Sequence, residues 1–530
     1  MATAQALVNE AGEQTRVRNV RTALLAWSVF MGAHTVATTA SAQVFRYPED
    51  MRPASLLPFF ADDMSSVRMV ELLFDGLVFQ NKRGDLEGAL ATQWSIDDDK
   101  KGVTFRLRRD VKWHDGKAFG AGDVVFTVKA AKDPRTIFQE KGRYDFIKDV
   151  RATGPLEVKF TFKRALNEPI RRFAFKILPR HGFRGTAIAR NDRFSRKPIG
   201  TGPYKVSRYT MRKVELESNT EYWHAPRIGQ VVMQHTPDKA AQVNLLQYSG
   251  GRAGVQAVIF LPPKNIPLFE NSESVILEPY HTVSWWYLAY NHANPALKDP
   301  IVRNAIALAM DREELLEANL GKGDILSGPF TESSPFYDFD VQLRSLNVEQ
   351  AKASLDKAGY VMKGNVRQKG KVKLEFKFVL NRGVAGQQSL FLGIQAQLKK
   401  IGVIVKKKYE DNAAYREAVF KKKNYDLTMN VWSFAEVEGV RGLFHSKGAS
   451  NFINYANPAV DALFDEAAKL TDYKQYQEKM MKLHGMLNKD LPYFFLWSLD
   501  VYSGISKRVR NVFIAPFYYF TSFREWELSP

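Results

Sequence analysis

The sequence predicts an α/β fold, and the main evidence lies between residues 372 and 432. Apolar and polar residues alternate from Val372 to Leu380, which is the period of a strand, and apolar residues then recur at helical spacing. The same order repeats downstream. Strands are expected at 372–380, 403–405 and 427–432, with helices over 390–402 and 413–420 between them. A β-α-β-α-β series of this kind forms a parallel sheet with right-handed crossovers.

Helix start signals support this interpretation of the C-terminal half. Asp299-Pro300 and Asn457-Pro458 each combine an N-cap residue with proline at the first helical position. Asn347 with Gln350 resembles a capping box, and Gly359 is placed to end that helix. These signals are structural and carry little information about function.

The N-terminal half is a mixture of strands and helices. Apolar residues alternate over 103–107 and 158–162, and Gly-Pro turns occur at 154–155 and 202–203. We expect an inserted segment between about residues 76 and 195. Domains usually contain about 100–200 residues, so the 488 residues that follow residue 42 (530 minus 42) should form two or three.

The loop that leaves the last predicted strand is the first candidate for a ligand site. In open α/β sheets, ligands bind beyond the carboxyl ends of the strands. That strand runs into Trp432, Ser433 and Ala435, so these residues are candidates for the wall of a binding cleft. The alternative, that Trp432 is a core residue, fits the periodicity equally well.

Consecutive aromatic residues provide a second candidate. Trp285, Trp286 and Tyr287 follow one another, and neighbouring side chains on a strand point to opposite faces. One tryptophan could therefore face a cleft, where aromatic side chains bury area at low entropic cost. The alternative is a sheet that is buried on both faces.

The N-terminal segment has the layout of a secretory signal peptide. Arg16, Arg18 and Arg21 precede an apolar run over 23–33, and Ala40-Ser41-Ala42 provides an A-x-A cleavage site. The apolar run is shorter than the roughly 20 residues of a membrane span. We therefore predict a signal peptide over 1–42 and an exported mature chain; the alternatives are an uncleaved anchor or a buried helix.

Composition narrows the class of protein. The chain has no cysteine, which excludes disulfides, thiol nucleophiles, Cys-ligated zinc and a lipid-modified cysteine in this sequence. We therefore expect a soluble periplasmic protein without a lipid anchor. The net charge is +19, and a basic balance can indicate nucleic acid, anionic membranes or acidic ligands. Lysine clusters at 406–408 and 421–423 flank apolar runs, so we interpret them as solvated ends of elements.

Motifs of catalysis are absent from the sequence. It contains no H-E-x-x-H zinc spacing, no G-x-S-x-G elbow and no glycine-rich phosphate loop. His114-Asp115 lies in Trp113-His114-Asp115-Gly116, which we interpret as a polar hairpin tip because Asp-Gly is a turn signal. We predict no catalytic residues, no metal ligands and no cofactor.

A set of motifs extends along the chain. They are LATQWSIDDD at 90–99, VTFRLRRDVKWHDGK at 103–117, GDVVF at 122–126, GTGPY at 200–204, NTEYW at 219–223, the segment 299–312, and NFINYANPAVD at 451–461. Together they resemble family 5 extracellular solute-binding proteins, the dipeptide and oligopeptide class of ABC-importer receptors. The resemblance covers essentially all of the chain after residue 42.

The resemblance implies a two-lobed periplasmic-binding-protein fold with hinge strands and an extra subdomain in the first lobe. The expected boundaries are 43–280 for lobe I, with the inserted subdomain at about 76–195, then 281–497 for lobe II and 498–530 for a return to lobe I. The ligand would be enclosed between the lobes. The residues that we predict to bind the ligand are Trp432, Ser433, Ala435, Trp285, Tyr287, Asn291, Arg441, Asn451 and Tyr455.

The sequence departs from the family pattern at one position that matters for the ligand. Peptide-binding members have an Asp at the position of Ala435, where it pairs with the peptide ammonium, and Glu436 or Glu438 could replace it. The implied function is a receptor that delivers a peptide or peptide-like solute to an ABC-type membrane permease by hinge closure. A non-peptide solute (an opine, a sugar-derived or an acidic ligand) and an exported hydrolase are the alternatives. We expect a monomer that binds no nucleic acid.

Overall fold

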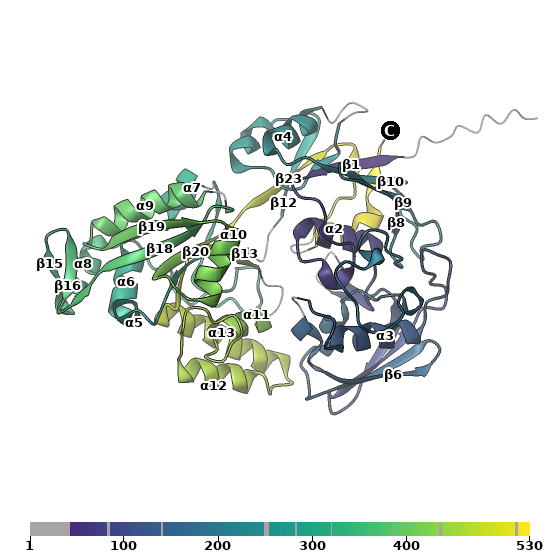
Figure 1. The fold of residues 1–530 in the computed structure, drawn as a ribbon, viewed down its shortest axis with the longest axis horizontal. Coiled ribbons are helices and arrows are strands. Elements are labelled where there is room, and N and C mark those ends of the chain that lie inside the picture. The colour runs from purple at the N-terminus through teal and green to yellow at the C-terminus, as the bar shows by residue number, and fades with distance from the viewer. Residues whose placement is uncertain are drawn as a thin grey trace, which may run out of the picture. The chain divides into compact units, whose positions relative to one another are not determined.

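The computed structural model describes residues 43–81, 85–138, 141–248, 254–280, 284–319, 321–384, 386–433, 437–514 and 518–529. The predicted signal peptide at 1–42 lies outside these residues, and so do Ala435 and Glu436. The described chain is a mixture of helices and strands, as the sequence predicts for an α/β fold (Figure 1).

Lobe I, as we use the term, comprises the elements up to β12 and those from β23 onward. Its sheets have the orders β1-β10-β9-β8, β4-β5-β7-β6 and β11-β23-β12, with the pairs β2-β3 and β24-β25. The strands are β1 (Val44–Glu49), β2 (Val78–Gln80), β3 (Leu86–Gly88), β4 (Ala91–Ile96), β5 (Gly102–Leu107), β6 (Ile147–Gly154), β7 (Glu157–Phe162), β8 (Tyr204–Tyr209), β9 (Lys213–Ser218), β10 (Gln230–His235), β11 (Ala257–Val258), β12 (Val275–Tyr280), β23 (Val501–Ser506), β24 (Val509–Arg510) and β25 (Glu527–Leu528). The α-helices are α2 (Met64–Leu73), α3 (Ala121–Lys132) and α4 (Lys239–Gln247), and short helices occur at η1 (Pro58–Phe60), η2 (Lys141–Tyr144), η3 (Pro169–Phe173), η4 (Arg180–Gly182), η5 (Arg193–Ser195), η6 (Pro263–Leu268) and η8 (Phe523–Glu525).

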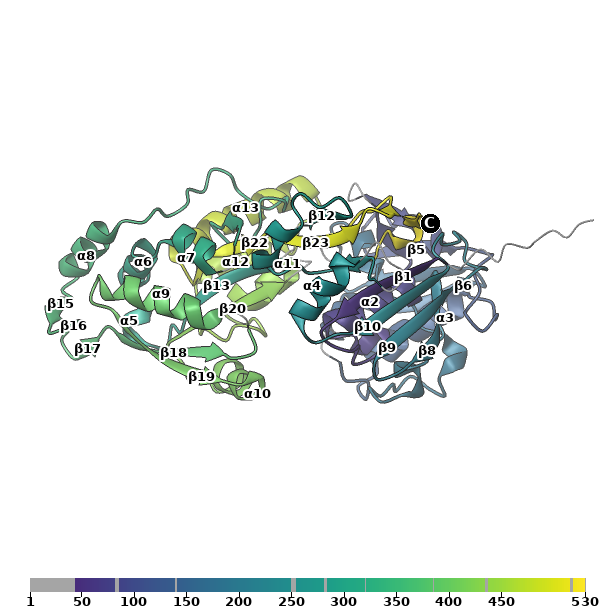
Figure 2. The same cartoon turned by 90° about the horizontal axis from the view of Figure 1, so that it is seen from above.

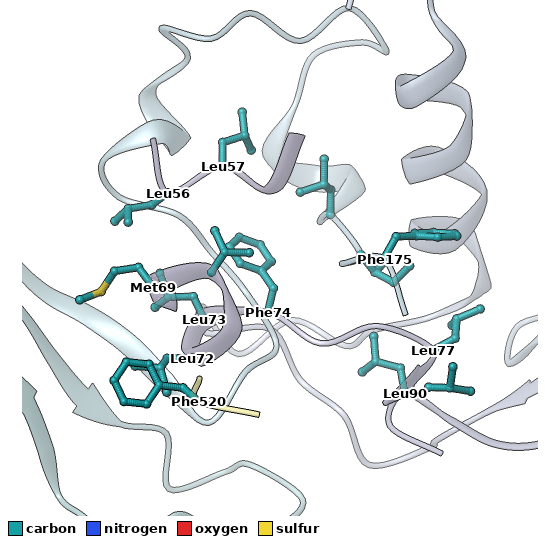
Figure 3. Close-up of a cluster of buried hydrophobic side chains, with 14 of the residues drawn as sticks. Leu56, Leu57, Met69, Leu72, Leu73, Phe74, Leu77, Leu90, Phe175 and Phe520 are labelled. Carbon is teal, nitrogen blue, oxygen red and sulfur yellow. The ribbon is translucent and has the colours of Figure 1, made fainter. Parts of the chain in front are cut away.

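The core of lobe I joins the two ends of the described chain. Phe45 of β1 packs edge-on against Phe523, with ring centroids 4.9 Å apart, and Tyr47 packs against Phe520 at 5.1 Å. Figure 3 shows Phe520 beside Leu72 of α2. Each of these side chains is at most 2 % exposed. The C-terminal segment therefore contributes to the same core as the first strand.

Two sequence motifs meet in lobe I through His114. Gly116 has φ of +82° and Lys112 bridges Ala118, so the expected turn is present. The interpretation of the whole motif as a polar tip was wrong, however, because His114 is half-buried: its Nδ1 accepts from the N–H of Gly200 at 3.1 Å, and its Nε2–H donates to the carbonyl of Gly202 at 3.0 Å. The ring thus joins the turn to the GTGPY segment.

Lobe II, the elements from β13 to β22, contains the predicted α/β series. Its main sheet has the order β19-β18-β20-β13-β21, with β14-β22 and β15-β16-β17 beside it. The strands are β13 (Ser284–Tyr290), β14 (Gly323–Ile325), β15 (Val361–Lys363), β16 (Val366–Lys369), β17 (Val372–Lys373), β18 (Glu375–Asn381), β19 (Ile404–Glu410), β20 (Leu427–Ser433), β21 (Tyr493–Phe495) and β22 (Trp497–Leu499). The helices are α5 (Pro295–Lys298), α6 (Pro300–Leu308), α7 (Arg312–Asn319), α8 (Val348–Lys357), α9 (Gln387–Lys399), α10 (Asn412–Arg416), the π-helical turn η7 (Glu417–Lys421), α11 (Val437–Phe444), α12 (Pro458–Ala467) and α13 (Tyr473–Asp490).

Strand pairing in lobe II agrees with the predicted parallel series. β18 pairs in parallel with both β19 and β20, while β13 is antiparallel to β20. Asp299, Asn347 and Asn457 cap α6, α8 and α12 as predicted, each accepting from a backbone N–H in the first turn. The lysines at 406–408, expected at the end of an element, lie inside the edge strand β19 instead.

Both faces of the main sheet are buried. Trp286 and Leu288 of β13 pack on one side with α6, α8 and α9, whereas Trp285 and Tyr287 pack on the other with α11, α12 and α13. Figure 2 shows helices on both sides of β13 and β20. Of the two interpretations left open for the tryptophan pair, the structure therefore supports the sheet with two buried faces.

The chain passes between the sheets of the two lobes along neighbouring strands. β12 and β23 are antiparallel partners, and the pairing extends to Tyr280 opposite Val501. Asp500 alone separates β22 of lobe II from β23 of lobe I. The paired strands β12 and β23 thus lie beside each other where lobe I ends, an arrangement typical of a hinge.

Candidate functional site

The carboxyl ends of β18, β19 and β20 lie at one edge of the main sheet. Because the three strands run in the same direction, their last residues, Asn381, Glu410 and Ser433, lie at the same end of the sheet. Trp432 is the penultimate residue of β20 and is partly buried. The strand order therefore agrees with the prediction that Trp432 and Ser433 lie at the carboxyl ends of the parallel strands, where ligands bind in open α/β sheets.

Trp432 packs against a cluster of aromatic side chains. Its ring is stacked on that of Tyr287, with centroids 5.8 Å apart and an interplanar angle of 12°, and it also contacts Phe420 and Phe452. Tyr287 is in turn stacked on Tyr493 at 4.6 Å. Burial raises the pKa of Tyr287 well above its usual value, so the phenol is neutral. Tyr287, predicted as a ligand contact, is a core residue in this structure.

Three of the predicted ligand-binding residues, Asn291, Asn451 and Tyr455, form hydrogen bonds with other parts of the protein. The side-chain amide of Asn291 donates to the carbonyls of Lys423 (3.1 Å) and Tyr425 (2.7 Å). It lies just beyond Tyr290, which is paired with Leu427 at the start of β20, and so at the opposite edge of the sheet from Trp432. The structure does not bring Asn291 and Trp432 together.

Asn451 and Tyr455 hold a loop between α11 and α12. The amide of Asn451 donates to the carbonyls of His445 (3.1 Å) and Tyr455 (2.7 Å), and the Tyr455 hydroxyl donates to Asp490. Both side chains are at most 9 % exposed. Their positions favour a structural role over ligand contact.

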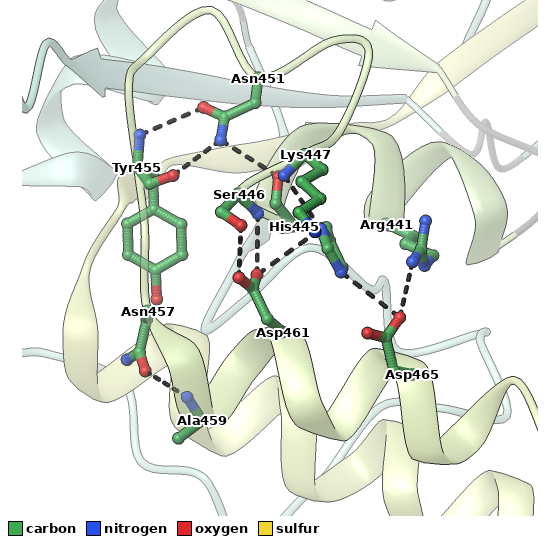
Figure 4. A network of polar contacts seen from close by, with 10 residues as sticks. All are labelled: Arg441, His445, Ser446, Lys447, Asn451, Tyr455, Asn457, Ala459, Asp461 and Asp465. Carbon is green, nitrogen blue, oxygen red and sulfur yellow. Dashed lines mark hydrogen bonds and ion pairs between the residues drawn. The ribbon is translucent and has the colours of Figure 1, made fainter.

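Arg441 belongs to a polar network between α11 and α12, shown in Figure 4. Its guanidinium donates to Asp465 at 2.7 Å, and this hydrogen bond holds the pKa of that carboxyl below its usual value. His445 lies 3.4 Å from the same carboxylate through Nε2. Arg441 of α11 and His445, which directly follows that helix, thus both contact Asp465, and Arg441 remains partly exposed.

Arg441 and Asp465 also line a cavity of about 690 Å³. The size is within the range of about 300–1,000 Å³ that is usual for small-molecule sites. Lobe I contributes Arg164, Leu166, Asn167, Glu168, Arg171 and Arg172, and lobe II contributes Phe336, Arg441, Phe464, Asp465, Ala467, Ala468, Lys469, Leu470, Tyr473, Tyr476 and Met480. Of the predicted ligand contacts, Arg441 is among these residues and Trp432 is not.

The charge around this cavity is positive. Arg171 pairs with Glu168 at 3.3 Å, and Arg441 pairs with Asp465, so each acidic residue is already matched. Arg164 and Lys469 line the cavity without a carboxylate within ion-pair distance among the described residues. Arginine binds carboxylates through two parallel hydrogen bonds, so the lining suits an anionic group.

Sequence reasoning missed the lobe I part of this lining. The Arg171-Arg172 pair lies on η3, a short helix that starts at Pro169, and no motif marks it. Tyr473 and Tyr476 come from the first turn of α13, whose N-cap Asp472 was a readable signal of helix start but not of function. Only the fold places these segments around one cavity.

Lobe I has a second, smaller cavity of about 330 Å³ around the start of α2. Ion pairs of Glu71 with Lys176 (2.8 Å) and of Asp62 with Arg190 (2.5 Å) occupy charged residues of its wall. Within the described residues, no group of three or more His, Asp or Glu side chains is arranged to hold a metal ion. None of the described helices is long and apolar enough to cross a membrane.

Two α/β lobes joined by paired strands, with a cavity lined from both, define the class of two-lobed solute-binding proteins. Comparisons with known proteins agree. Residues 85–452 match the model of "Bacterial extracellular solute-binding proteins, family 5 Middle". The chain belongs to this family of solute receptors, and its fold is the two-lobed α/β fold that the sequence predicts.

The individual relatives have low sequence identity, but the similarity extends over most of this chain and of each relative. The oligopeptide-binding protein AppA of Bacillus subtilis is 28% identical over 467 residues, 84% of each chain. The dipeptide-binding protein of Escherichia coli is 23% identical over 540 residues, which is 94% of this chain and 98% of the relative. The solved structure of AppA from Bacillus subtilis in complex with a nonapeptide is similar with a TM-score of 0.78 at 24% identity, covering 92% of this chain and 99% of that one.

Proposed function

We propose that this protein is a periplasmic receptor that binds a peptide or peptide-like solute and delivers it to an ABC-type importer permease. The observation that carries the proposal is the cavity of about 690 Å³, which residues of both lobes line. A solute can favour closure only if it binds the closed state more tightly, and contacts from both lobes provide that difference. The relatives named above as peptide-binding support the ligand class.

The hinge of this receptor is the pair of connections beside Tyr280 and Val501. Bending there would change the distance between Arg164 of lobe I and Arg441 of lobe II, which line the same cavity. The permease would recognise the closed form. We propose lobe boundaries of 43–280, 281–497 and 498–530, with the inserted subdomain at about 76–195, and a soluble monomer without a lipid anchor, catalytic activity or nucleic-acid partner.

A second candidate ligand is an acidic non-peptide solute, and the cationic lining favours it. Arg164 and Lys469 have no acidic partner among the described residues, so an anion would gain charge-assisted hydrogen bonds there. Ala435 also lacks the carboxylate that pairs with a peptide ammonium in the peptide-binding class. The C-terminal carboxylate of a peptide would form the same charge-assisted hydrogen bonds with Arg164.

Thermal unfolding with solute panels tests the proposal. A bound solute raises stability by mass action, by about 2.7 kcal/mol at 100 times Kd, so a peptide panel from two to nine residues should raise Tm. Sugar acids and dicarboxylates form the second panel. A rise with acids alone supports the second candidate, and no rise with either panel contradicts a receptor for these solutes.

The peptide terminus can be tested separately. Because position 435 is Ala, we expect an N-acetylated peptide to bind within tenfold of its free-amine form, whereas amidation of the C-terminus should weaken binding. Calorimetric titration of the three matched peptides measures both effects. A loss of more than tenfold on acetylation would place an ammonium-binding carboxylate in the site.

A further inference from the structure

Most of the positive charge of this protein is concentrated in one short segment. Residues 357–409 contain thirteen Lys and Arg residues and a single acidic residue, Glu375. That excess of twelve compares with a net charge of +19 for all 530 residues. The remaining chain is therefore only mildly basic, and the charge is a local property that needs a local explanation.

The fold gathers two parts of this segment, residues 361–373 and 399–402, at one end of lobe II. The N–H of Arg367 on β16 donates to the carbonyl of Gly402 at 2.8 Å, and its guanidinium donates to that of Ile401 at 2.9 Å. The small sheet β15-β16-β17 is thereby held against the turn between α9 and β19. Figures 1 and 2 show β15 and β16 at the end of lobe II next to α8.

The cations of this end are exposed and unneutralised. We call Lys363, Lys369, Lys371, Lys373, Lys399 and Lys400 the basic end; all six are exposed. None of them has a carboxylate within ion-pair distance among the described residues, since Asp356 pairs with the buried Arg367 and Glu375 pairs with Lys406. Lysines 399 and 400 also end α9, where the helix dipole favours cations.

Apolar side chains lie among these lysines. Val361 and Met362 of β15 are 52% and 50% exposed, although they are adjacent to Lys363. Val361 and Lys363 share one face of β15, whereas Met362 lies on the opposite face, and a basic surface with an exposed apolar side chain is typical of proteins that bind membranes. Lysine is a strongly hydrated point charge without the fork of arginine, so the surface suits diffuse attraction to many phosphates better than one fixed ligand.

We propose that the basic end binds the surface of a bilayer that contains anionic phospholipids. The lysines are attracted to such a surface within a Debye length of about 8–10 Å, and the half-exposed Val361, which lies on the same face of β15 as Lys363, would enter the headgroup layer. The contact would keep a diffusible receptor close to the membrane in which its permease lies. The cavity lining on α11 to α13 is formed by other residues, so solute binding does not require this contact.

Vesicle co-sedimentation tests the proposal on the mature protein. At low salt, vesicles with about one third phosphatidylglycerol should sediment the protein, whereas pure phosphatidylcholine vesicles should not. Raising the salt to about 0.5 M should release it, because screening shortens the Debye length. The quadruple variant Lys363→Gln, Lys371→Gln, Lys373→Gln and Lys400→Gln should lower the partition coefficient at least tenfold.

A matched control separates a local surface from net charge. Lys101→Gln, Lys129→Gln, Lys148→Gln and Lys163→Gln remove the same charge from exposed positions of lobe I and should change partitioning less than twofold. Unchanged Tm in both variants excludes unfolding. Equal losses in the two variants, no binding to anionic vesicles, or equal salt-sensitive binding to soluble polyphosphate and to vesicles would overturn the proposal. A loss on Val361→Gln supports apolar insertion.

Discussion

Trp285 and Trp432 are directly opposed on the antiparallel strands β13 and β20, yet they differ in exposure. Trp285 is 2% exposed and packs with Tyr287 and Phe495, whereas Trp432 is partly exposed at the end of its strand. Opposed residues share a face of the sheet, so the two rings differ in depth and not in direction. Their replacement should therefore have different consequences.

Trp432→Ala is expected to weaken solute binding at least tenfold, which corresponds to about 1.4 kcal/mol. The side chain lies at the carboxyl end of β20 and is only partly buried, so its loss removes contact area for a ligand that extends beyond the cavity of about 690 Å³ to this end of the sheet. Calorimetric titration with the solute identified by thermal unfolding measures the change. An unchanged Kd would show that Trp432 is not part of the site.

Trp285→Ala is the matched control for that experiment. The ring is fully packed, so truncation creates a cavity and should lower the free energy of unfolding by about 3–5 kcal/mol. Affinity of the remaining folded protein should change less than threefold. Urea unfolding at 25 °C gives the stability, and a small change in stability with a large loss of affinity would reverse the roles of the two tryptophans.

Arg164→Gln should weaken binding of carboxylate-bearing solutes about tenfold. The guanidinium lines the cavity and has no ion-pair partner among the described residues, so a ligand carboxylate gains a new charge-assisted hydrogen bond. Lys163→Gln, one residue earlier and outside the lining, is the control and should have no effect. Equal effects of both changes on Kd would indicate general electrostatics.

The fold was predictable because its signals are local. The N-caps Asp299, Asn347 and Asn457 are set by hydrogen bonds two or three residues away, and the parallel order follows from the alternation of strand and helix. The end of α9 was expected at Gly402, but the helix stops at Lys399 and Gly402 supplies the positive φ of the turn into β19.

The site was less predictable because it depends on which edge of the sheet a residue reaches. Asn291 follows the aromatic run on β13, but that strand runs opposite to β20 and ends at the other edge. Tyr455 was predicted as a ligand contact, and its hydroxyl donates to Asp490 of α13. Arg171 lies on η3, far from Arg441 in sequence, and only the folded chain places both around one cavity.

Stability should fall as the pH decreases from about 6.5 to about 4. Burial lowers the pKa of His114, His292 and His484 to about 4, so the unfolded chain binds protons over this range and the folded chain does not. The contribution of each neutral ring is thus complete above its unfolded pKa and lost progressively below it. Each is worth of order 1–3 kcal/mol by linkage.

Urea unfolding between pH 7.5 and 4 measures this dependence. His484 is the informative position, because its Nε2 is 2.8 Å from the Ser327 hydroxyl and its ring is fully buried. His484→Gln should lower stability at pH 7.5 and make the pH dependence shallower. His235→Gln, at a histidine that is not fully buried, is the control for replacing an imidazole elsewhere, and His484→Gln should change the slope more than this variant does. A slope that stays the same in both variants would contradict the assignment.

Tyr287→Phe should leave stability unchanged or raise it by up to about 1 kcal/mol. The hydroxyl is buried without a hydrogen-bond partner among the described residues, so its removal relieves a desolvation cost. The ring keeps its stacking on Trp432 and Tyr493, because phenylalanine has the same aromatic area.

Tyr455→Phe is the matched comparison and should lower stability by about 1–3 kcal/mol. Its hydroxyl donates to the Asp490 carboxylate, whose other neighbour Asn457 also binds the same oxygen at 3.0 Å. Urea unfolding of both variants against the parent gives the two differences. If Tyr287→Phe costs as much as Tyr455→Phe, the Tyr287 hydroxyl has a partner, and a loss of solute affinity in that variant would identify the partner as the ligand.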